Sequence, residues 1–335
     1  ALPYLLSYHV LSRTRIERPE LVLRILVFAA AAAGFLCTFE MIRVWPIYSG
    51  LAPLKGLWVL VDTPEMMLIR GGFFRAFGPF SHPLAASAVL GMGGVALYCL
   101  FRLRGPNPAL FLLGAAILLG QFATVSRTGI VALVAGLTTV QLLRRRYGSV
   151  VLITVLGLIV TFGLPALSNQ ETDGTAAYRL ALLLGVPKAL GSHLIFGYRE
   201  ATASGMLDAF VQGQGIVDLV NIYLAIAVTG GVVSLIPYLF FLGSTIGQYR
   251  ALRRAKPNND QLLLAQACVG MQAGFIVAGA FMGAWGTSMI ISMLCVAMIV
   301  ALRSEVAPAA VGERKKAAFE IEPISGVEIL PMSRW

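Results

Sequence analysis

The stretch PLAASAVLGMGGVALYCLF at residues 83–101 decides the fold, because no side chain in it is charged. A helix needs about 20 apolar residues to cross the hydrocarbon core of a bilayer. Two arginines, Arg102 and Arg104, follow it directly. Basic residues of this kind mark the cytoplasmic ends of membrane helices. The stretch therefore predicts a transmembrane helix.

The composition of the whole chain agrees with a membrane protein. Of its 335 residues 58% are hydrophobic and 13% are charged, and the mean hydropathy is +0.80. Soluble domains average about 45–50% apolar and about 25% charged residues. The composition excludes an ordinary cytosolic globule, a disordered protein and, despite the net charge of +10, a nucleic-acid-binding module. The 4 cysteines all stand in apolar runs, which indicates helix packing and no redox chemistry.

Apolar stretches of similar length predict an all-α polytopic membrane bundle. Residues 1–10 are too short to span and read as the end of a truncated helix. We expect residues 1–303 to form the bundle and residues 304–335 to form a mobile cytoplasmic tail. The eight predicted spans are 20–42, 83–101, 108–125, 128–143, 149–167, 217–247, 261–282 and 285–303. In the long span 217–247, Pro237 predicts a kink, and Gly230 and Gly231 predict a looser helix.

The basic residues predict the orientation. If the eight spans alternate, 17 of the 26 lysines and arginines fall on one side, which is then cytoplasmic. The long segments 43–82 and 168–216 lie outside, and we expect them to form a chamber on the external face. Within the second, residues 176–190 predict an amphipathic helix that breaks before Lys188, at Pro187.

Several chemistries have no support in the sequence. It contains no P-loop, no GxGxxG after a strand, no HExxH and no CxxC pair, so we expect no metal and no cofactor. The predicted spans carry no charged residue near mid-membrane, whereas ion-coupled transporters usually need one there. An ion-driven pump is therefore disfavoured.

Arginines on the external side suggest anion binding. Arg75, Arg127, Arg179 and Arg199 come from four separate segments. A guanidinium grips phosphate oxygens bidentately, so arginines brought together at one membrane face could clamp a pyrophosphate without a metal. The alternative is local pairing with acids, which is favoured for Arg199 beside Glu200. Function is favoured for Arg127, which stands in a tight turn with no acid nearby in the sequence.

A second cluster begins the long span. Gln214, Asp218 and Asn221 fall on one helical face. A partly desolvated Asp218 would have a raised pKa suited to accepting a proton from a sugar hydroxyl. It could equally be a carboxylate favoured by the positive end of the helix. His82, at a helix entrance, is a second candidate base, although a lone histidine there is more often structural.

Four motifs occur in the order known from one family. They are RAFGPFSHPLAASAVLG (75–91), SRTGIVALVAG (126–136), YRLALLLGVPKALGSHLIFGY (178–198) and VDLVNIYLAIAVTGGVVSLIPYL (217–239). Together they resemble the O-antigen ligase and O-antigen polymerase superfamily of bacterial envelope glycosyltransferases. The resemblance covers about residues 70–240, and the SRTG turn and the FGY-to-NIYL stretch are its most specific parts.

The resemblance implies a membrane glycosyltransferase of the GT-C type in the bacterial inner membrane, with its active site facing the periplasm. Such an enzyme takes a glycan from an undecaprenyl-diphosphate carrier without a metal or a nucleotide sugar. Arg75, Arg127 and Arg179 would bind the diphosphate. The glycan would contact Gln214 and Asn221. Tyr198, Tyr178 and Trp45 are candidate stacking surfaces for it, and the alternative is that they belong to the aromatic belt of the membrane interface, which is favoured for Trp45. The implied partners are the lipid-linked oligosaccharide, the bilayer and, as a further candidate, a chain-length regulator protein, but no nucleic acid.

One departure from the family pattern favours a polymerase. In the ligases a histidine typically precedes the asparagine of the last motif, and here Val220 precedes Asn221. A ligase that moves glycan to lipid A–core with a histidine base is therefore the less favoured alternative. A non-enzymatic transporter of a lipid-linked glycan is the second alternative. It would need polar residues spread along several spans.

Overall fold

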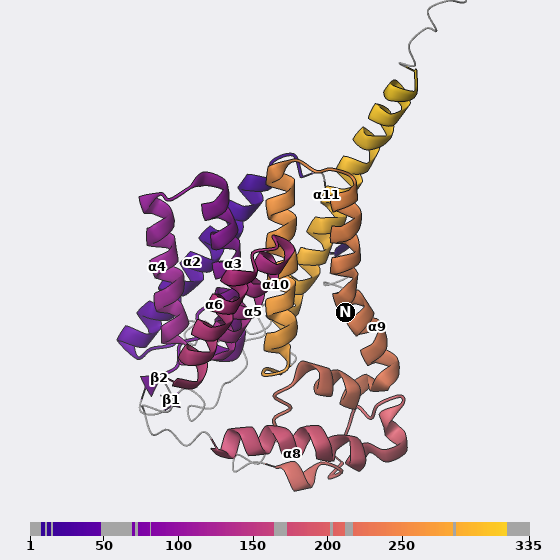
Figure 1. The fold of residues 1–335 in the computed structure, drawn as a ribbon. Coiled ribbons are helices and arrows are strands. Elements are labelled where there is room, and N and C mark those ends of the chain that lie inside the picture. The colour runs from indigo at the N-terminus through magenta and orange to yellow at the C-terminus, as the bar shows by residue number, and fades with distance from the viewer. Residues whose placement is uncertain are drawn as a thin grey trace, which may run out of the picture.

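The structure is a computed structural model that describes residues 8–10, 12–14, 16–47, 69–70, 73–80, 82–163, 173–201, 204–211, 217–283 and 286–319. Almost all of these residues are helical. Two short strands, β1 (Ile69–Arg70) and β2 (Phe73–Phe74), form an antiparallel pair. The described part is therefore an all-α bundle, as expected (Figure 1).

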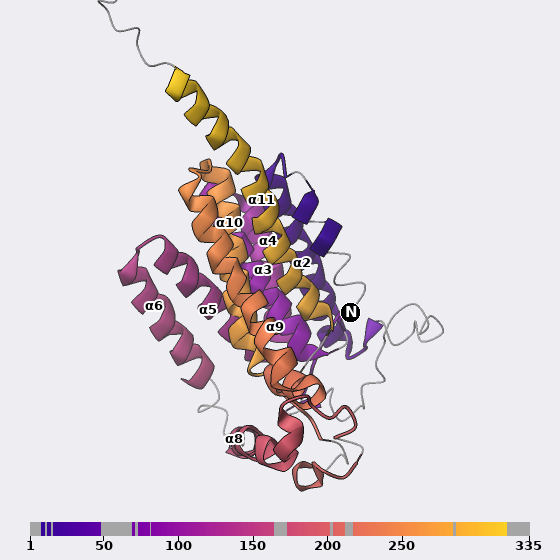
Figure 2. The ribbon, with the colours of Figure 1, turned by 90° about the vertical axis from the view of Figure 1, so that its right-hand side faces the viewer.

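Eight helices of the described part run up and down in an antiparallel bundle (Figures 1 and 2). At one end the chain carries arginines, for example Arg102 and Arg104 at the end of α3, and we call it the basic end. We call the other the α8 end, because helix α8 (Asp173–Leu190) lies beyond it. The bundle helices are α2 (Pro19–Arg43), α3 (Pro83–Arg104), α4 (Pro108–Ala123), α5 (Thr128–Leu143), α6 (Tyr147–Leu158), α9 (Ile222–Arg254), α10 (Asn259–Gly279) and α11 (Gly286–Phe319).

Five helical segments in the described part are long and apolar enough to cross a membrane, fewer than the eight spans we expected. They are α2, α3, α9, α10 and residues 289–306 of α11. Helices α4 and α5 have 16 residues each and rise about 24 Å, short of a core about 30 Å thick. Helix α6 ends at Leu158, and a π-helical turn, η3 (Ile159–Gly163), follows it. These apolar helices are thus too short to count as spans by length.

Glycines allow the bundle helices to approach closely. A Cβ on Gly129 of α5 would overlap the backbone oxygen of Ser87 in α3, and a Cβ on Gly91 would overlap the backbone oxygen of Gly129. Small residues at such crossings let membrane helices pack by direct backbone contact. All four cysteines are buried and unbridged, in keeping with a packing role.

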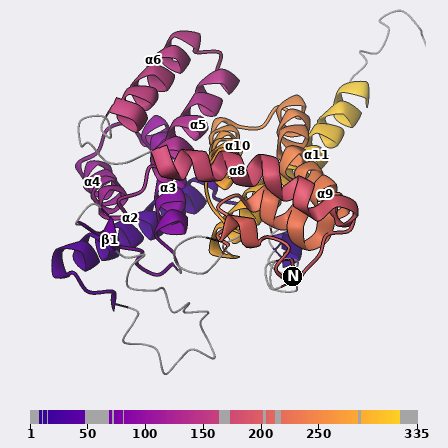
Figure 3. The ribbon, with the colours of Figure 1, turned by 90° about the horizontal axis from the view of Figure 1, so that it is seen from below.

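Helix α8 lies crosswise to the bundle (Figures 1 and 3). The expected break at Pro187 is wrong, because the helix continues through this proline to Leu190. A proline near the last turn removes only one hydrogen-bond donor there, so the break is not enforced. The helix is also not amphipathic in the usual sense, because Leu182 and Val186 are buried while Leu180 and Leu184, on the other side, are exposed.

Helix α9 is interrupted at Gly231, whose φ of 67° and ψ of −176° are not helical. The interruption exposes backbone groups, and residues 195–198 satisfy them. The Tyr198 N–H donates to the Val228 carbonyl at 2.7 Å, and the Val233 N–H donates to the Ile195 carbonyl at 3.2 Å. The break in the long span is therefore at Gly231, and α9 continues as a helix through Pro237.

Helix α11 extends past the boundary that we expected at residue 303. It runs to Phe319, so residues 304–319 continue the helix where we had placed the start of a tail. In Figure 1 this part of α11 projects from the basic end of the bundle. The remainder of the expected tail, residues 320–335, lies outside the described residues.

Candidate functional site

The α8 end of the bundle is organised by a buried carboxylate that we did not single out from the sequence. Glu40, near the end of α2, is 0% exposed. Its Oε2 accepts the N–H groups of Phe77 at 3.0 Å and Gly78 at 2.7 Å, and its Oε1 accepts the N–H of Ile47 at 3.0 Å. A carboxylate with backbone donors on both oxygens holds a loop firmly. Glu40 therefore fixes the loop 75–80, which carries Arg75, to α2.

The same loop lies against the turn between α4 and α5. The N–H of Ala76 donates to the carbonyl of Ala123 at 3.0 Å, and the Nε of Arg75 lies 3.5 Å from the carbonyl oxygen of Thr124. Arg127 is the N-cap residue of α5 at the end of this turn. Arg75 and Arg127, which are 52 positions apart in the sequence, thus belong to adjoining segments at the α8 end.

A buried polar network shapes the SRTG turn. Gln121 Nε2 donates to Ser87 Oγ at 2.7 Å and to the Ser126 carbonyl at 3.0 Å, and the Gly129 N–H donates to Ser87 Oγ at 2.7 Å. Ser126 and Gly129 are buried, whereas the side chain of Arg127 is half-buried. The network holds the backbone on both sides of Arg127, so the position from which the Arg127 side chain extends is fixed.

Arg179 meets two other segments. Its guanidinium carbon lies 5.5 Å from the ring centroid of Phe281, just past the end of α10, within cation–π range. Its positive charge also lowers the pKa of the carboxyl group of Asp218, just before α9. The neighbouring Tyr178 hydroxyl donates to the carbonyls of Phe210 at 3.1 Å and Asp218 at 3.3 Å. One turn of α8 therefore holds together α10, the segment before α9 and the 204–211 loop.

Asp218 is partly buried, as expected, but it lies in a non-helical segment. Residues 217–220 precede α9 and Asn221 is its N-cap, so the helical face that we predicted for Gln214, Asp218 and Asn221, and the start of the span at residue 217, are wrong. Burial raises the pKa of its carboxyl above the ordinary value, and the positive charge of Arg179 opposes that rise. Burial disfavours the charged form, so the carboxylate accepts a proton more readily than an exposed one. Asp218 is therefore placed to exchange a proton beside a guanidinium.

His82 has a structural use. It is the N-cap of α3, and its Nδ1 accepts the N–H of Leu84 at 3.1 Å. Burial, together with the charge of Arg75, lowers the pKa of this histidine to about 4. A neutral imidazole that accepts at Nδ1 carries its proton on Nε2, so it has no lone pair left to accept another. His82 is therefore a poor general base.

The remaining predicted site residues have diverse positions. Asn221 caps α9, and its Oδ1 accepts the N–H groups of Tyr223 at 2.9 Å and Leu224 at 3.1 Å. The ring of Tyr198 stacks on His193 with centroids 5.1 Å apart, which occupies one ring face. Arg199 and Trp45 are exposed. Gln214 lies outside the described residues.

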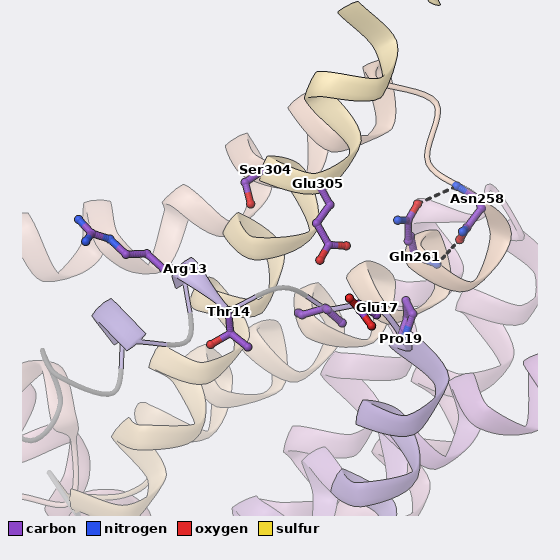
Figure 4. A pocket seen from close by; sticks show the side chains of 9 residues that line it. Arg13, Thr14, Glu17, Pro19, Asn258, Gln261, Ser304 and Glu305 are labelled. Carbon is purple, nitrogen blue, oxygen red and sulfur yellow. Dashed lines mark hydrogen bonds between the residues drawn. The ribbon is translucent and has the colours of Figure 1, made fainter. Parts of the chain in front are cut away.

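A pocket at the basic end is far from these arginines. It has a volume of about 710 Å³ and lies between the chain before α2 and the helices α10 and α11 (Figure 4). Its lining includes Arg13, Glu17, Gln261 and Glu305. Figure 4 shows side chains of both charges there, without a group arranged around one point. Charged groups from separate segments lie at the α8 end, with Arg75 and Arg127 on adjoining segments and Arg179 acting on Asp218, and this favours the α8 end as the candidate functional site.

Among the described residues no group of three or more histidine, cysteine, aspartate or glutamate side chains is placed to hold a metal ion. No family model matches the chain. No curated protein and no solved structure matches it either.

Proposed function

We propose that this chain is a membrane glycosyltransferase, a polysaccharide polymerase that acts at the α8 end of the bundle on a lipid-diphosphate-linked glycan. The observation that carries the proposal is that arginines from three segments lie at this end: Arg75 and Arg127 on adjoining segments, and Arg179 where its charge acts on Asp218. The proposal also takes the periplasm as the side on which the α8 end lies and the bacterial inner membrane as its location.

The arginines suit the departure of a lipid diphosphate. When the bond between the anomeric carbon and the phosphate oxygen breaks, negative charge develops on the leaving diphosphate. Guanidinium groups that are already in place stabilise this charge without reorganisation. The backbone around Arg127 is held by buried hydrogen bonds, and Arg179 is packed on Phe281. In this proposal the arginines do what a metal ion does in other glycosyltransferases, so chelation should leave the activity unchanged.

The acceptor hydroxyl needs a group that takes its proton. In the proposed step this hydroxyl oxygen forms a bond to the anomeric carbon, its proton goes to the carboxylate of Asp218, and the lipid diphosphate leaves. Asp218 suits this role because burial raises its pKa, while the positive charge of Arg179 opposes that rise. His82 is not used as a base here, because its Nδ1 is committed to the cap of α3.

The test measures glycan chain length in a host that lacks this protein and is complemented with wild type or with a variant. Arg127→Lys keeps the charge but loses the bidentate grip, so we expect long chains to disappear while single repeats remain. Arg146→Lys at the exposed basic end is the matched control and should behave as wild type.

Other outcomes separate the alternatives. Full-length polymer that accumulates on the lipid carrier would indicate a ligase acting on lipid A–core. Long chains that persist with both Arg127→Lys and Arg127→Ala would refute the arginine clamp and favour a transporter of the lipid-linked glycan. Each arm requires the variant to be present in membranes at the wild-type level, which an immunoblot checks.

A further inference from the structure

The turn at residues 193–199, which we call the FGY turn, connects the α8 layer to α9. Its backbone is fixed there by the hydrogen bonds from Tyr198 to Val228 and from Val233 to Ile195. Gly197 and Gly231 pack directly against each other, because a Cβ on Gly197 would lie 2.5 Å from the Gly231 nitrogen. The FGY turn is therefore held against α9 at the break at Gly231.

Two large apolar side chains of the FGY turn are exposed in the described structure, whereas the preceding Leu194 is partly buried against α8 and α9. Ile195 is 56% exposed and Phe196 is 75% exposed. Exposing both to water would be unfavourable, since large apolar side chains are normally withdrawn from it. Their exposure calls for a nonaqueous neighbour outside the described chain.

The surface beside them identifies that neighbour. An exposed apolar stripe on α9 consists of Val233, Ile236 and Phe240. The backbone N–H of Val233 donates a hydrogen bond to the carbonyl of Ile195. Helix α9 is long and apolar enough to cross a membrane, so a stripe of this kind is the face that meets lipid tails. Ile195, and with it Phe196, is held next to the first residue of this stripe, beside the break at Gly231.

The polar residues around the FGY turn follow the pattern of a membrane interface. Tyr198 stacks on His193, and Lys188 and Arg199 on either side are exposed. Tyrosine rings concentrate at the level of lipid headgroups, and long basic side chains reach from there to the phosphates. An interfacial anchor combines apolar side chains that enter the lipid with aromatic and basic side chains at the headgroups. Ile195 and Phe196 supply the first, and Tyr198, Lys188 and Arg199 the second.

We propose that the FGY turn is a membrane anchor: Ile195 and Phe196 insert into the lipid leaflet at the α8 end and hold the α8 layer on the bilayer surface. The partner is the lipid itself, not a protein. This inference goes beyond the proposed reaction and does not depend on it. It would hold α8, and with it Arg179, near the level of the lipid phosphates.

The experiment uses the full chain in proteoliposomes, with a nitroxide spin label on a single introduced cysteine. The four native cysteines are buried, so the unsubstituted protein serves as the labelling blank. The test variant is Phe196→Cys. Leu118→Cys, at a position 53% exposed on α4, is the lipid reference, and Ser204→Cys, at an exposed position, is the aqueous reference. Collisions with oxygen report lipid exposure, and collisions with a water-soluble nickel chelate report water exposure.

We expect the label at residue 196 to resemble that at residue 118, with a ratio of oxygen to nickel accessibility several-fold above that at residue 204. A ratio equal to that at residue 204 would place the turn in water and overturn the proposal. Low accessibility to both reagents would overturn it too, because it would mean that protein covers the turn, whether a second copy or another segment of this chain. If the spin label at residue 196 disturbs the fold, Ile195→Cys provides the same measurement at the neighbouring position.

Discussion

At the scale of single residues, His82 provides a test that needs no substrate. Its pKa is lowered to about 4, mainly by burial, whereas an unfolded histidine titrates near pH 6.5. Between these values the unfolded chain binds the extra proton, so stability is complete above pH 6.5 and falls as the pH drops towards 4. The loss amounts to about 3 kcal/mol at most.

The matching variant is His82→Asn, because asparagine also caps helices but does not titrate. We expect its unfolding free energy in detergent to depend less on pH between 6.5 and 4 than that of wild type, with similar stability at pH 7. The measurement is a set of denaturation curves across this range. Identical pH slopes for the two proteins would show that His82 is not desolvated.

Asp218 and Arg179 make a second prediction at this scale, which applies to the proposed transfer. The rate should fall as the pH drops through the raised pKa of Asp218, because the base must be ionised. Arg179 opposes the rise of that pKa, so Arg179→Gln should move the acid limb of the kcat–pH profile to higher pH, besides weakening donor binding. If the acid limb does not move in Arg179→Gln, the charge of Arg179 does not influence the pKa of the group that acts as the base.

The residue scale also shows where sequence reasoning stops. That Asp218 is partly buried near the beginning of α9 could be predicted from the apolar stretch that follows it, but its place outside the helix could not, because the helix begins only at Ile222, after the Asn221 cap. Glu40 could not be predicted as an anchor, because two of its hydrogen-bond partners, Phe77 and Gly78, are 37 and 38 positions away. The only signal in the sequence was a carboxylate near the end of an apolar stretch.

At the scale of elements, Glu40 joins α2 to the loop of Arg75. Glu40→Ala leaves the buried N–H groups of Phe77 and Gly78 and the part-buried N–H of Ile47 without an acceptor, and the loss of an acceptor for a buried group costs about 1–3 kcal/mol. Glu40→Gln keeps one acceptor oxygen and should lose less stability. Glu20→Gln is the control on the same helix, since it removes ion pairs of partly exposed groups with Arg24 and Arg104, worth up to about 1 kcal/mol each. Denaturation curves in detergent rank the variants by their free energy of unfolding. Equal losses of stability in Glu40→Ala and Glu20→Gln would contradict the role of Glu40 in fixing the loop 75–80.

The break in α9 gives the second prediction for elements. At Gly231 the φ of 67° disfavours any side chain, and a Cβ would overlap the Ile195 carbonyl. We expect Gly231→Ala to destabilise the protein by about 1–3 kcal/mol and to release the FGY turn. Gly243→Ala, later in α9, has no atom within 4 Å of the new Cβ, so it should leave stability unchanged or raise it by up to about 1 kcal/mol.

Proteolysis reports the release separately from the stability. The FGY turn should be cut faster in Gly231→Ala than in Gly243→Ala under native conditions. Equal rates of cleavage would show that the contact between Gly197 and Gly231 does not hold the turn. The sequence indicated the site of this break, because Gly230 and Gly231 predicted a looser helix there, and the structure confirms it at Gly231. It could not show that residues 195–198, far away in the sequence, would supply the hydrogen bonds that complete the break.

At the scale of the whole molecule, the ends of the bundle differ in charge. Arg102 and Arg104 end α3, and Arg253 and Arg254 end α9, all at the basic end. The alternation that we predicted from hydropathy could be obtained from the sequence, because it needs only the order of apolar stretches. The number of full spans could not, because α4 and α5 have the composition of spans but a length of 16 residues each.

The charge difference makes a prediction about orientation. Basic residues stay on the cytoplasmic side of a membrane, so the basic end should be cytoplasmic and the α8 end external. Asn259→Cys, exposed at the start of α10, and Ser204→Cys, exposed at the α8 end, report the two sides. Both substitutions replace uncharged residues, so neither changes the charges that determine orientation. The buried native cysteines should give little background.

A membrane-impermeant maleimide applied to intact spheroplasts should label Ser204→Cys and leave Asn259→Cys unlabelled until the membrane is opened. The reverse pattern would put the arginines of the α8 end in the cytoplasm, where a glycan assembled on an external lipid carrier could not reach them. The proposed polymerase would then be untenable, whereas the anchoring of the FGY turn, tested by lipid accessibility alone, would still stand, in the opposite leaflet. Orientation therefore tests the polymerase proposal independently of any activity assay.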